Sequence, residues 1–270
     1  MSFQDRLRLD SRVALVTGGG AGIGRAIALG LASQGAHIAV LDIDPTAAKQ
    51  TIQQIICLGG YATSWVCNVT NSSEVSDTIR AVIDHHQKLD IVINSAGVAS
   101  APGMPFTNNS VSDWERALSI NLMGAVHVCK ESHAALLKSE AARIINISSI
   151  TGVISAAYMP PYSVSKAALI SLSKVLARDL ALHSITVNAV CPGFIWTPMW
   201  ESLGLAMAEH SQGEQGKTAE EVFKSRVDKH VPLGRPQTLE DIADAVAFLS
   251  SSAASNITGQ VLCVDGGVTI

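Results

Sequence analysis

Residues 13–35, VALVTGGGAGIGRAIALGLASQG, decide the fold. The first five are apolar, as in a buried strand, and the last eleven have the apolar periodicity of a helix. The glycines between them allow a tight turn and let a pyrophosphate approach the backbone, because no Cβ stands in the way. The first amides of the helix, which we expect to begin near Gly22, would face that group. The segment therefore predicts a dinucleotide cradle formed by Gly18, Gly22, Ile23 and Gly24.

Working outward, strand-like and helix-like segments alternate along the chain. Continuous apolar runs are typical of strands that are covered on both faces. We expect such strands at 13–17, 37–42, 63–68, 91–94, 143–148, 186–190 and 260–264. We expect helices at 25–34, 46–58, 74–87, 114–138, 163–182 and from 238 onward. The alternation predicts an α/β fold, a doubly wound parallel seven-stranded sheet (Rossmann fold) with helices on both faces, as one domain over residues 1–270.

Residues 194–232 interrupt this rhythm, because they separate two expected strands and contain no strand pattern. A long excursion at the carboxyl edge of such a sheet commonly forms a lid or a substrate loop. Within it, the charged segment 218–230 fits a lid helix and a solvated surface helix equally well.

Composition and charge restrict the partners. The chain has 270 residues, of which 47% are hydrophobic, and a net charge of −4. Its apolar runs are far shorter than the roughly 20 residues that cross a bilayer, and its first residues do not resemble a secretory signal. The basic residues are scattered, and the five cysteines and eight histidines lack disulfide-scaffold or metal-ligand spacing. We expect a cytoplasmic protein without a metal, a membrane anchor or a nucleic-acid partner.

Asp42 ends the second expected strand and bears on the choice of dinucleotide. A carboxylate at this place can accept hydrogen bonds from the ribose hydroxyls of NAD, and it would repel the 2′-phosphate of NADP. Ala21 and Ile43 are neutral where a basic side chain could have bound that phosphate. The sequence therefore predicts NAD as the cofactor.

Tyr162 and Lys166 are four residues apart, so they share one face of the expected helix. A tyrosine titrates at about pH 10 in water, and a neighbouring ammonium group would lower its pKa toward the working range. A Tyr-x-x-x-Lys pair alone is common on helices, so its meaning depends on the residues that accompany it.

The accompanying motifs occur in a fixed order. They are TGGGAGIG (17–24), NSAG (94–97), Asn121 within SINLMG, NISS (146–149), YSVSK (162–166), CPG (191–193) followed by Thr197, LGRPQTLEDIA (233–243) and ITGQVLCVDGG (257–267). With these motifs the chain resembles the short-chain dehydrogenase/reductase family over essentially its whole length. The resemblance implies hydride transfer between NAD and an alcohol/ketone pair.

The resemblance also implies roles for the reacting residues. Tyr162 would be the general acid/base, and Ser149 would hydrogen-bond the substrate oxygen; Ser149 is preferred to Ser148 on spacing alone. Lys166 would lower the pKa of Tyr162 and bind the nicotinamide ribose. Asn121 would hold a water that links the lysine to solvent.

Further cofactor contacts are implied in the same way. They are Asn68, Val69, Asn94, Ala96, Gly97, Pro192, Gly193, Ile195 and Thr197, together with Tyr162 and Lys166. Asn68 stands where the family usually has Asp against the adenine, and its carbonyl could still accept from the adenine amino group. Ser95 stands where a second Asn is common.

For the substrate we expect an apolar or mixed pocket, walled by Ser149, Thr151, Met159, Phe194, Trp196 and Trp200. Such a pocket favours a small or medium secondary alcohol, acyloin, polyol or cyclic substrate. Two alternatives stay open: a 3-oxoacyl-thioester reductase, against which Asp42 and the net acidity argue, and a non-catalytic nucleotide-sensing protein. The resemblance implies a homotetramer or dimer, built through the helices at 114–138 and 163–182.

Overall fold

The computed structural model describes residues 2–211 and 213–270, and within them seven strands form one sheet. The strand order is β3-β2-β1-β4-β5-β6-β7, and every neighbouring pair is parallel. The strands are β1 (Val13–Thr17), β2 (His37–Asp42), β3 (Tyr61–Val66), β4 (Ile91–Asn94), β5 (Arg143–Ile147), β6 (Thr186–Pro192) and β7 (Val261–Val264). The order reverses between β1 and β4, which is where ligands bind in open sheets of this kind.

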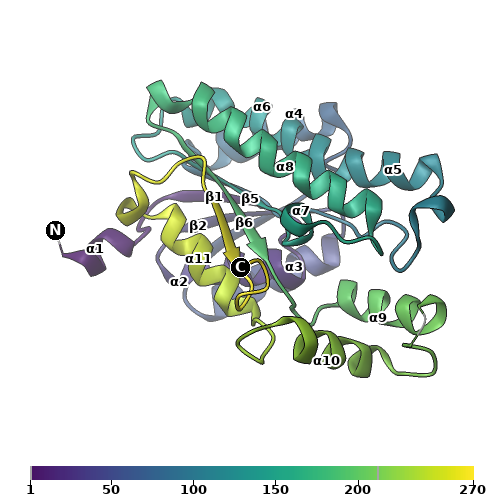
Figure 1. The fold of residues 1–270 in the computed structure, drawn as a ribbon. Coiled ribbons are helices and arrows are strands. Elements are labelled where there is room, and N and C mark those ends of the chain that lie inside the picture. Colours follow the sequence, from purple (N-terminus) through teal and green to yellow (C-terminus); the bar gives the residue numbers. More distant parts are fainter. Residues whose placement is uncertain (1, 212) are drawn as a thin grey trace.

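Helices cover both faces of the sheet, so the predicted fold class is confirmed (Figure 1). One layer contains α2 (Gly22–Ser33), α3 (Pro45–Cys57) and α11 (Leu239–Ser250), and the other contains α4 (Ser72–His86), α6 (Gly124–Leu136) and α8 (Pro160–Asp179). The remaining helices are α1 (Phe3–Leu7), α5 (Val111–Leu118), α7 (Thr151–Ile154), α9 (Pro198–His210) and α10 (Ala219–His230).

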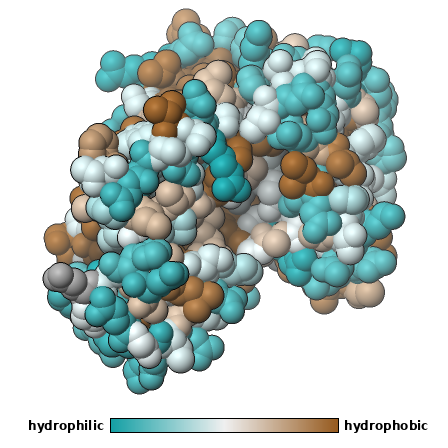
Figure 2. Space-filling model, turned by 90° about the vertical axis from the view of Figure 1, so that its right-hand side faces the viewer, coloured by the Kyte–Doolittle hydropathy of each residue, from teal (hydrophilic) through white to brown (hydrophobic). Residues whose placement is uncertain are grey.

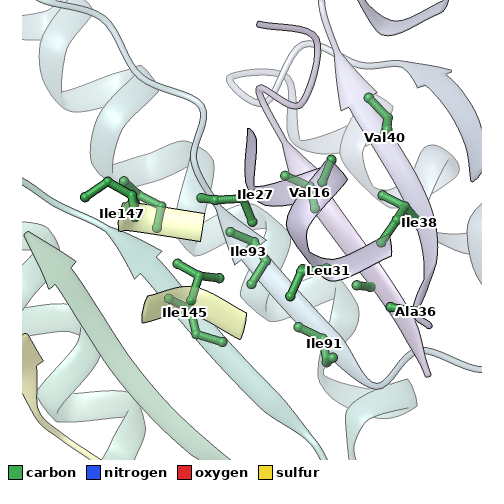
Figure 3. Packing of buried hydrophobic residues seen from close by; sticks show 14 of the residues in the cluster. Val16, Ile27, Leu31, Ala36, Ile38, Val40, Ile91, Ile93, Ile145 and Ile147 are labelled. Atoms are coloured by element: carbon green, nitrogen blue, oxygen red, sulfur yellow. The ribbon is translucent and has the colours of Figure 1, made fainter. Parts of the chain in front are cut away.

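The core explains why the strands read as continuous apolar runs. Successive residues of a strand point to opposite faces of the sheet. Val16 and Ile93 therefore pack against Ile27 and Leu31 of α2 (Figure 3), whereas Leu15 packs into the opposite layer. All five side chains are fully buried. Burial on both faces fixes β1 and β4 rigidly, and their carboxyl ends form the floor on which a ligand site can be built.

Two elements differ from the sequence expectation. Strand β3 lies two residues earlier than the expected 63–68, because it is an edge strand whose half-exposed residues give a weak apolar signal. The expected helix at 114–138 is three segments: α5, a π-helical turn at Ser119–Met123, and α6. Such a turn accommodates an extra residue within a helix and often marks a functional site.

The excursion after β6 forms α9 and α10, which pack against each other at one end of the molecule (Figure 1). Thr218 caps α10, and Val222, Phe223 and Val227 of this helix are buried while its charged face is exposed. The segment 218–230, for which a lid helix and a solvated surface helix were both open, is therefore an amphipathic helix. Figure 2, which faces the right-hand side of Figure 1, shows a hollow in the surface with apolar residues in its depth.

A cluster of aromatic and imidazole rings lies at the β3 edge of the sheet. The rings of His37 and Tyr61 are 4.8 Å apart, and those of His85 and His86 on α4 are 4.7 Å apart. His86 Nε2 lies 3.0 Å from the hydroxyl of Thr63. Burial, and then the nearby imidazoles of His85 and His37, lower the pKa of His86 from 6.5 to about 4.

The depressed pKa of His86 predicts a loss of stability in acid. Because the folded protein resists a proton that the unfolded chain accepts below about pH 6.5, the free energy of unfolding should fall as the pH decreases from 6.5 toward 4. His86→Gln, which can keep a bond to Thr63, should reduce this fall. Thermal unfolding at pH 7 and pH ~4.5 measures it, with the exposed His183→Gln as the control. Equal losses of Tm in the wild type and His86→Gln would contradict the assignment.

Candidate functional site

The glycine-rich turn after β1 is packed so closely that side chains at Gly18 and Gly24 would collide with backbone. Gly18 has a φ of +64°, and a Cβ there would lie 2.8 Å from Cα of Ala96; a Cβ on Gly24 would collide with the carbonyl of Gly18. Among the residues that the structure describes, no side chain caps α2 and no acidic residue lies in its first turn. The first amides of α2 are thus available to an anion, as a pyrophosphate requires.

Asp42 lies at the end of β2, beside this cradle. Its Oδ2 accepts from the amide of Gly20 at 2.8 Å, and its Oδ1 accepts from the amide of Asp44 at 3.0 Å. The carboxylate therefore shapes the turn as well as lining the cleft described below. Arg25 is a nearby basic residue that the sequence reasoning did not consider. Its guanidinium is engaged by the carbonyl of Gly20 and, at 3.1 Å, by the hydroxyl of Thr51.

A cleft of about 510 Å³ runs from this cradle to the pair Tyr162 and Lys166. Of the expected cofactor residues, twelve line it: Gly18, Gly22, Ile23, Gly24, Asp42, Asn68, Val69, Ala96, Gly97, Tyr162, Lys166 and Thr197. Pro192, Gly193 and Ile195 line a smaller cavity that adjoins it. Asn94 lies outside both linings and is buried, where its Nδ2 donates to Oδ1 of Asn146 at 2.8 Å.

Asn68 lines the cleft, but its carbonyl is already engaged. Oδ1 accepts from the amide of Thr70 at 3.1 Å and from the hydroxyl of Thr70 at 2.9 Å. The expectation that this carbonyl accepts from an adenine amino group therefore needs correction, because both lone pairs already hold the turn that follows β3.

Tyr162 and Lys166 lie in the first two turns of α8, which begins with two prolines suited to a helix start. Both side chains are buried. Nζ of Lys166 donates to the carbonyl of Ile147 at the end of β5 at 2.8 Å, and lies 5.6 Å from the centre of the Tyr162 ring. A Cβ on Gly97 would lie 3.3 Å from the same Nζ. The end of β5 at Ile147 and the segment after β4 at Gly97 thus hold the ammonium group near the tyrosine.

The pKa of Tyr162 is the main correction to the sequence expectation. Burial raises it to about 12, although a hydrogen bond with Ser149 opposes the rise. Burial likewise lowers the pKa of Lys166 to about 8. The expected lowering of the tyrosine pKa by the lysine is not seen, because the loss of hydration of the buried phenol dominates. At neutral pH the pair consists of a phenol and an ammonium group.

Ser149 and Ser148 make different contacts. Oγ of Ser149 accepts from the amide of Thr151 at 3.1 Å and from its hydroxyl at 3.0 Å, and it bonds with Tyr162. Oγ of Ser148 donates to the carbonyl of Lys166 at 2.8 Å. The structure thus brings Ser149, rather than Ser148, into contact with the tyrosine hydroxyl.

Asn121 lies in the π-helical turn and ties two segments together. Its Oδ1 accepts from the amide of Val98 at 2.8 Å, and its Nδ2 donates to the carbonyl of Val98 at 3.0 Å and to Oγ of Ser165 at 2.9 Å. Both amide hydrogens are therefore used to fix the chain after Gly97 against α8. The expected water between Asn121 and Lys166 stays a prediction.

The smaller cavity has a volume of about 90 Å³ and lies beside the tyrosine. Thr151, Met159, Phe194 and Trp200 line it, as expected. Ile23, Ser148, Tyr162, Thr197 and Met199 lie in both linings, so the cavity and the cleft share one wall.

Two expected pocket residues lie elsewhere. Trp196 is 38% exposed and packs edge-on against Phe223, with ring centroids 5.2 Å apart. Ser149 lies behind the lining, which its neighbours Ser148 and Ile150 form.

Sequence reasoning missed four residues that line the smaller cavity, Tyr158, Ile150, Met199 and Leu203. Met199 and Leu203 could have been found from their i, i+4 spacing on α9, and Tyr158 from its place four residues before Tyr162.

In the described part of the chain, no group of three or more His, Cys, Asp or Glu side chains could hold a metal ion. None of the described helices combines the length and the apolar character that crossing a bilayer requires.

Comparisons with known proteins agree with this geometry. Residues 18–269 match the family described as "Enoyl-(Acyl carrier protein) reductase". 3-Oxoacyl-[acyl-carrier-protein] reductase FabG of Thermotoga maritima is 32% identical over 264 residues, which are 98% of this chain and 100% of the relative. The structure of NAD+-bound xylitol dehydrogenase is similar with a TM-score of 0.90 and 34% identity, covering 96% of this chain and 99% of that one. A 7α-hydroxysteroid dehydrogenase in complex with NADH and 7-oxo glycochenodeoxycholic acid has a TM-score of 0.86 and 33% identity, covering 99% of this chain and 98% of that one.

Proposed function

Because this chain belongs to the short-chain dehydrogenase/reductase family of oxidoreductases, we propose that it is an NAD-dependent enzyme that interconverts a secondary alcohol and a ketone. One observation carries the proposal: a single continuous cleft has the glycine cradle and Asp42 at one end and Tyr162 and Lys166 at the other. A dinucleotide lying in this cleft would place its reactive ring beside the tyrosine.

Three features support NAD as the dinucleotide. At Gly18 the positive φ and the close approach of Ala96 exclude a Cβ, and no side chain caps the first amides of α2. Asp42 supplies a negative charge where a 2′-phosphate would lie, and the nearby guanidinium of Arg25 is engaged by Gly20 and Thr51. Two of the similar solved structures contain NAD+ or NADH.

The reaction needs a hydride and a proton to move between two partners. When bound, NAD would accept the hydride from the alcohol carbon, and NADH would return it to the ketone carbon. Tyr162 takes the hydroxyl proton as the alcohol becomes a ketone, and gives it back to the carbonyl oxygen in reduction. Ser149 hydrogen-bonds the reacting oxygen together with the tyrosine, and Lys166 stabilises the phenolate.

The pH dependence should differ between the two directions. Oxidation needs the phenolate of Tyr162, which is a small fraction near pH 7 because burial raises the tyrosine pKa to about 12. We therefore expect kcat/KM for alcohol oxidation to rise from pH ~7 until Lys166 loses its proton and no longer stabilises the phenolate, which produces a plateau. The kcat/KM for ketone reduction should not rise over the same range. Because the pKa of Lys166 is about 8, the plateau should begin near that pH. Initial rates from NADH absorbance test this, and an oxidation rate that falls over the range would contradict it.

A second candidate function is reduction of 3-oxoacyl thioesters. The similarity to the Thermotoga maritima reductase favours it, while Asp42 and the net charge of −4 argue against the NADPH and the basic carrier-binding patch that it would need. A panel of alcohols, ketones and one 3-oxoacyl thioester, each with NAD(H) and NADP(H), separates the two. Turnover of the thioester alone would favour the second candidate, and NAD binding without any turnover would favour a nucleotide sensor.

The excursion and the long helices support two further parts of the proposal. Residues of α9 wall the smaller cavity, so the 194–232 segment serves as a substrate lid. The helices at 114–138 and 163–182 expose apolar side chains, including Val164 and Val175 of α8, that a homotetramer or dimer would bury. Light scattering of the purified protein measures the oligomeric state.

A further inference from the structure

The smaller cavity presents few polar groups. In the described part of the chain, its side-chain hydroxyls are those of Ser148, Thr151, Tyr158, Tyr162 and Thr197. Three of them are engaged: Ser148 donates to the carbonyl of Lys166, Thr151 to Oγ of Ser149, and Thr197 accepts from the amide of Trp200. Tyr162 is committed to the reacting oxygen. Tyr158 is therefore the hydroxyl of this cavity that is neither engaged within the described part of the chain nor assigned to the reacting oxygen.

The hydroxyl of Tyr158 has no hydrogen-bond partner among residues 2–211 and 213–270, although its ring is held in place. Its carbonyl accepts from the amide of Gly103 at 2.9 Å. On α10, the guanidinium of Arg226 lies 5.6 Å from the ring centre, and its Nε lies 3.4 Å from Oε1 of Glu214. Neighbouring segments of the protein thus hold the Tyr158 ring in place and leave its hydroxyl free to bind another molecule.

The two phenols belong to one site. Tyr158 and Tyr162 line the same cavity and pack in the same apolar cluster with Met159 and Leu203. Burial is the main cause of the raised pKa of Tyr162, and the nearby Tyr158 phenol adds to it. A substrate whose reacting oxygen contacts Tyr162 would therefore have Tyr158 within reach of a second oxygen.

The rest of the lining restricts the substrate further. None of the described residues that line the cavity is charged, and most are apolar, such as Ile150, Phe194 and Trp200. Burying an unpaired charge there would be strongly unfavourable, so the substrate is uncharged in this part. The volume of about 90 Å³ is smaller than the ~150 Å³ cavity that admits benzene, so the apolar ends of the substrate are short.

We propose that Tyr158 determines specificity by hydrogen-bonding a second, uncharged oxygen on the carbon next to the reacting carbon. The substrates are then acyloins and vicinal diols with short alkyl ends, oxidised or reduced at one of the two oxygens. This inference rests on the proposed alcohol/ketone chemistry and assigns its substrate class.

The test compares acetoin with methyl isopropyl ketone, which carries a methyl group where acetoin has its hydroxyl. The wild type with NADH should reduce acetoin with a kcat/KM up to about tenfold higher, since one satisfied hydrogen bond contributes up to about that factor. Tyr158→Phe should lose about tenfold on acetoin, mainly through KM, and less than about twofold on methyl isopropyl ketone. Tyr61→Phe, at an exposed tyrosine on β3, is the matched control and should change neither.

The outcomes separate the two levels of the proposal. If the wild type reduces both ketones equally well, or Tyr158→Phe slows both by the same factor, Tyr158 is a packing residue and the inference is overturned. If the wild type reduces neither these ketones nor others in the panel, the proposed alcohol/ketone function fails instead. Should Tyr158→Phe fail to fold, Tyr158→Leu takes its place, and a ratio between the two ketones equal to that of the wild type would overturn the inference.

Discussion

Replacing Tyr162 by Phe should lower kcat in both directions by about a thousandfold or more, while the affinity for NADH stays nearly unchanged. A positioned general acid/base contributes about 10² to 10⁴ to the rate, and the substitution removes the only atom that can carry the proton. The ring itself remains, so packing against Met159 and Leu203 is kept. Turnover from NADH absorbance and NADH binding by fluorescence measure the two effects separately.

Tyr61→Phe serves as the control for Tyr162→Phe, because it removes the same atom from a tyrosine outside the cleft. Turnover that survives Tyr162→Phe would contradict the proposed role of the hydroxyl. Loss of NADH binding along with turnover would instead show that the tyrosine mainly shapes the cleft.

The second large effect concerns the cofactor. Asp42→Asn combined with Ile43→Arg should shift the ratio of kcat/KM for NAD over NADP by about a hundredfold or more toward NADP. A like charge beside a phosphate costs several kcal/mol, and each 1.4 kcal/mol is about tenfold. Ile43 is 66% exposed at the mouth of the cleft, so an arginine there has room.

Asn is chosen at position 42 because its carbonyl can still accept from the amide of Gly20 or of Asp44, which keeps part of the turn. Ile43→Arg alone separates the added positive charge from the lost negative one. A wild type that already prefers NADP, or a double variant whose preference does not move, would contradict the role given to Asp42.

Most of the fold could be predicted because a parallel sheet buries both faces of its strands. β1, β2 and β4 were expected at the bounds they have, since burial on both sides leaves continuous apolar runs. β3 was misplaced because its residues are mostly half-exposed, so no continuous apolar run marks its start at Tyr61 and Ala62. The π-helical turn at Ser119–Met123 could not be predicted, because one extra residue barely disturbs the apolar periodicity.

The site was predictable where one helix carries it and less so where several elements meet. The spacing of Tyr162 and Lys166 predicted their common face on α8, and the structure places them there. The expected lowering of the tyrosine pKa took no account of how deeply neighbouring elements bury the ring, which raises the pKa. Trp196 was placed in the pocket on composition alone, and its direction is set by packing against α10.

Thr197 and Met199, at the start of α9, line both the long cleft and the small cavity. A movement of this turn that admits one ligand therefore reshapes the wall that the other ligand contacts. Two ligands that act on one such element have linked affinities, and each changes the affinity of the other by the same factor. Substrate affinity in this protein is then a property of the ternary complex, and a dissociation constant measured on the empty enzyme would describe a different equilibrium from the one that operates in turnover.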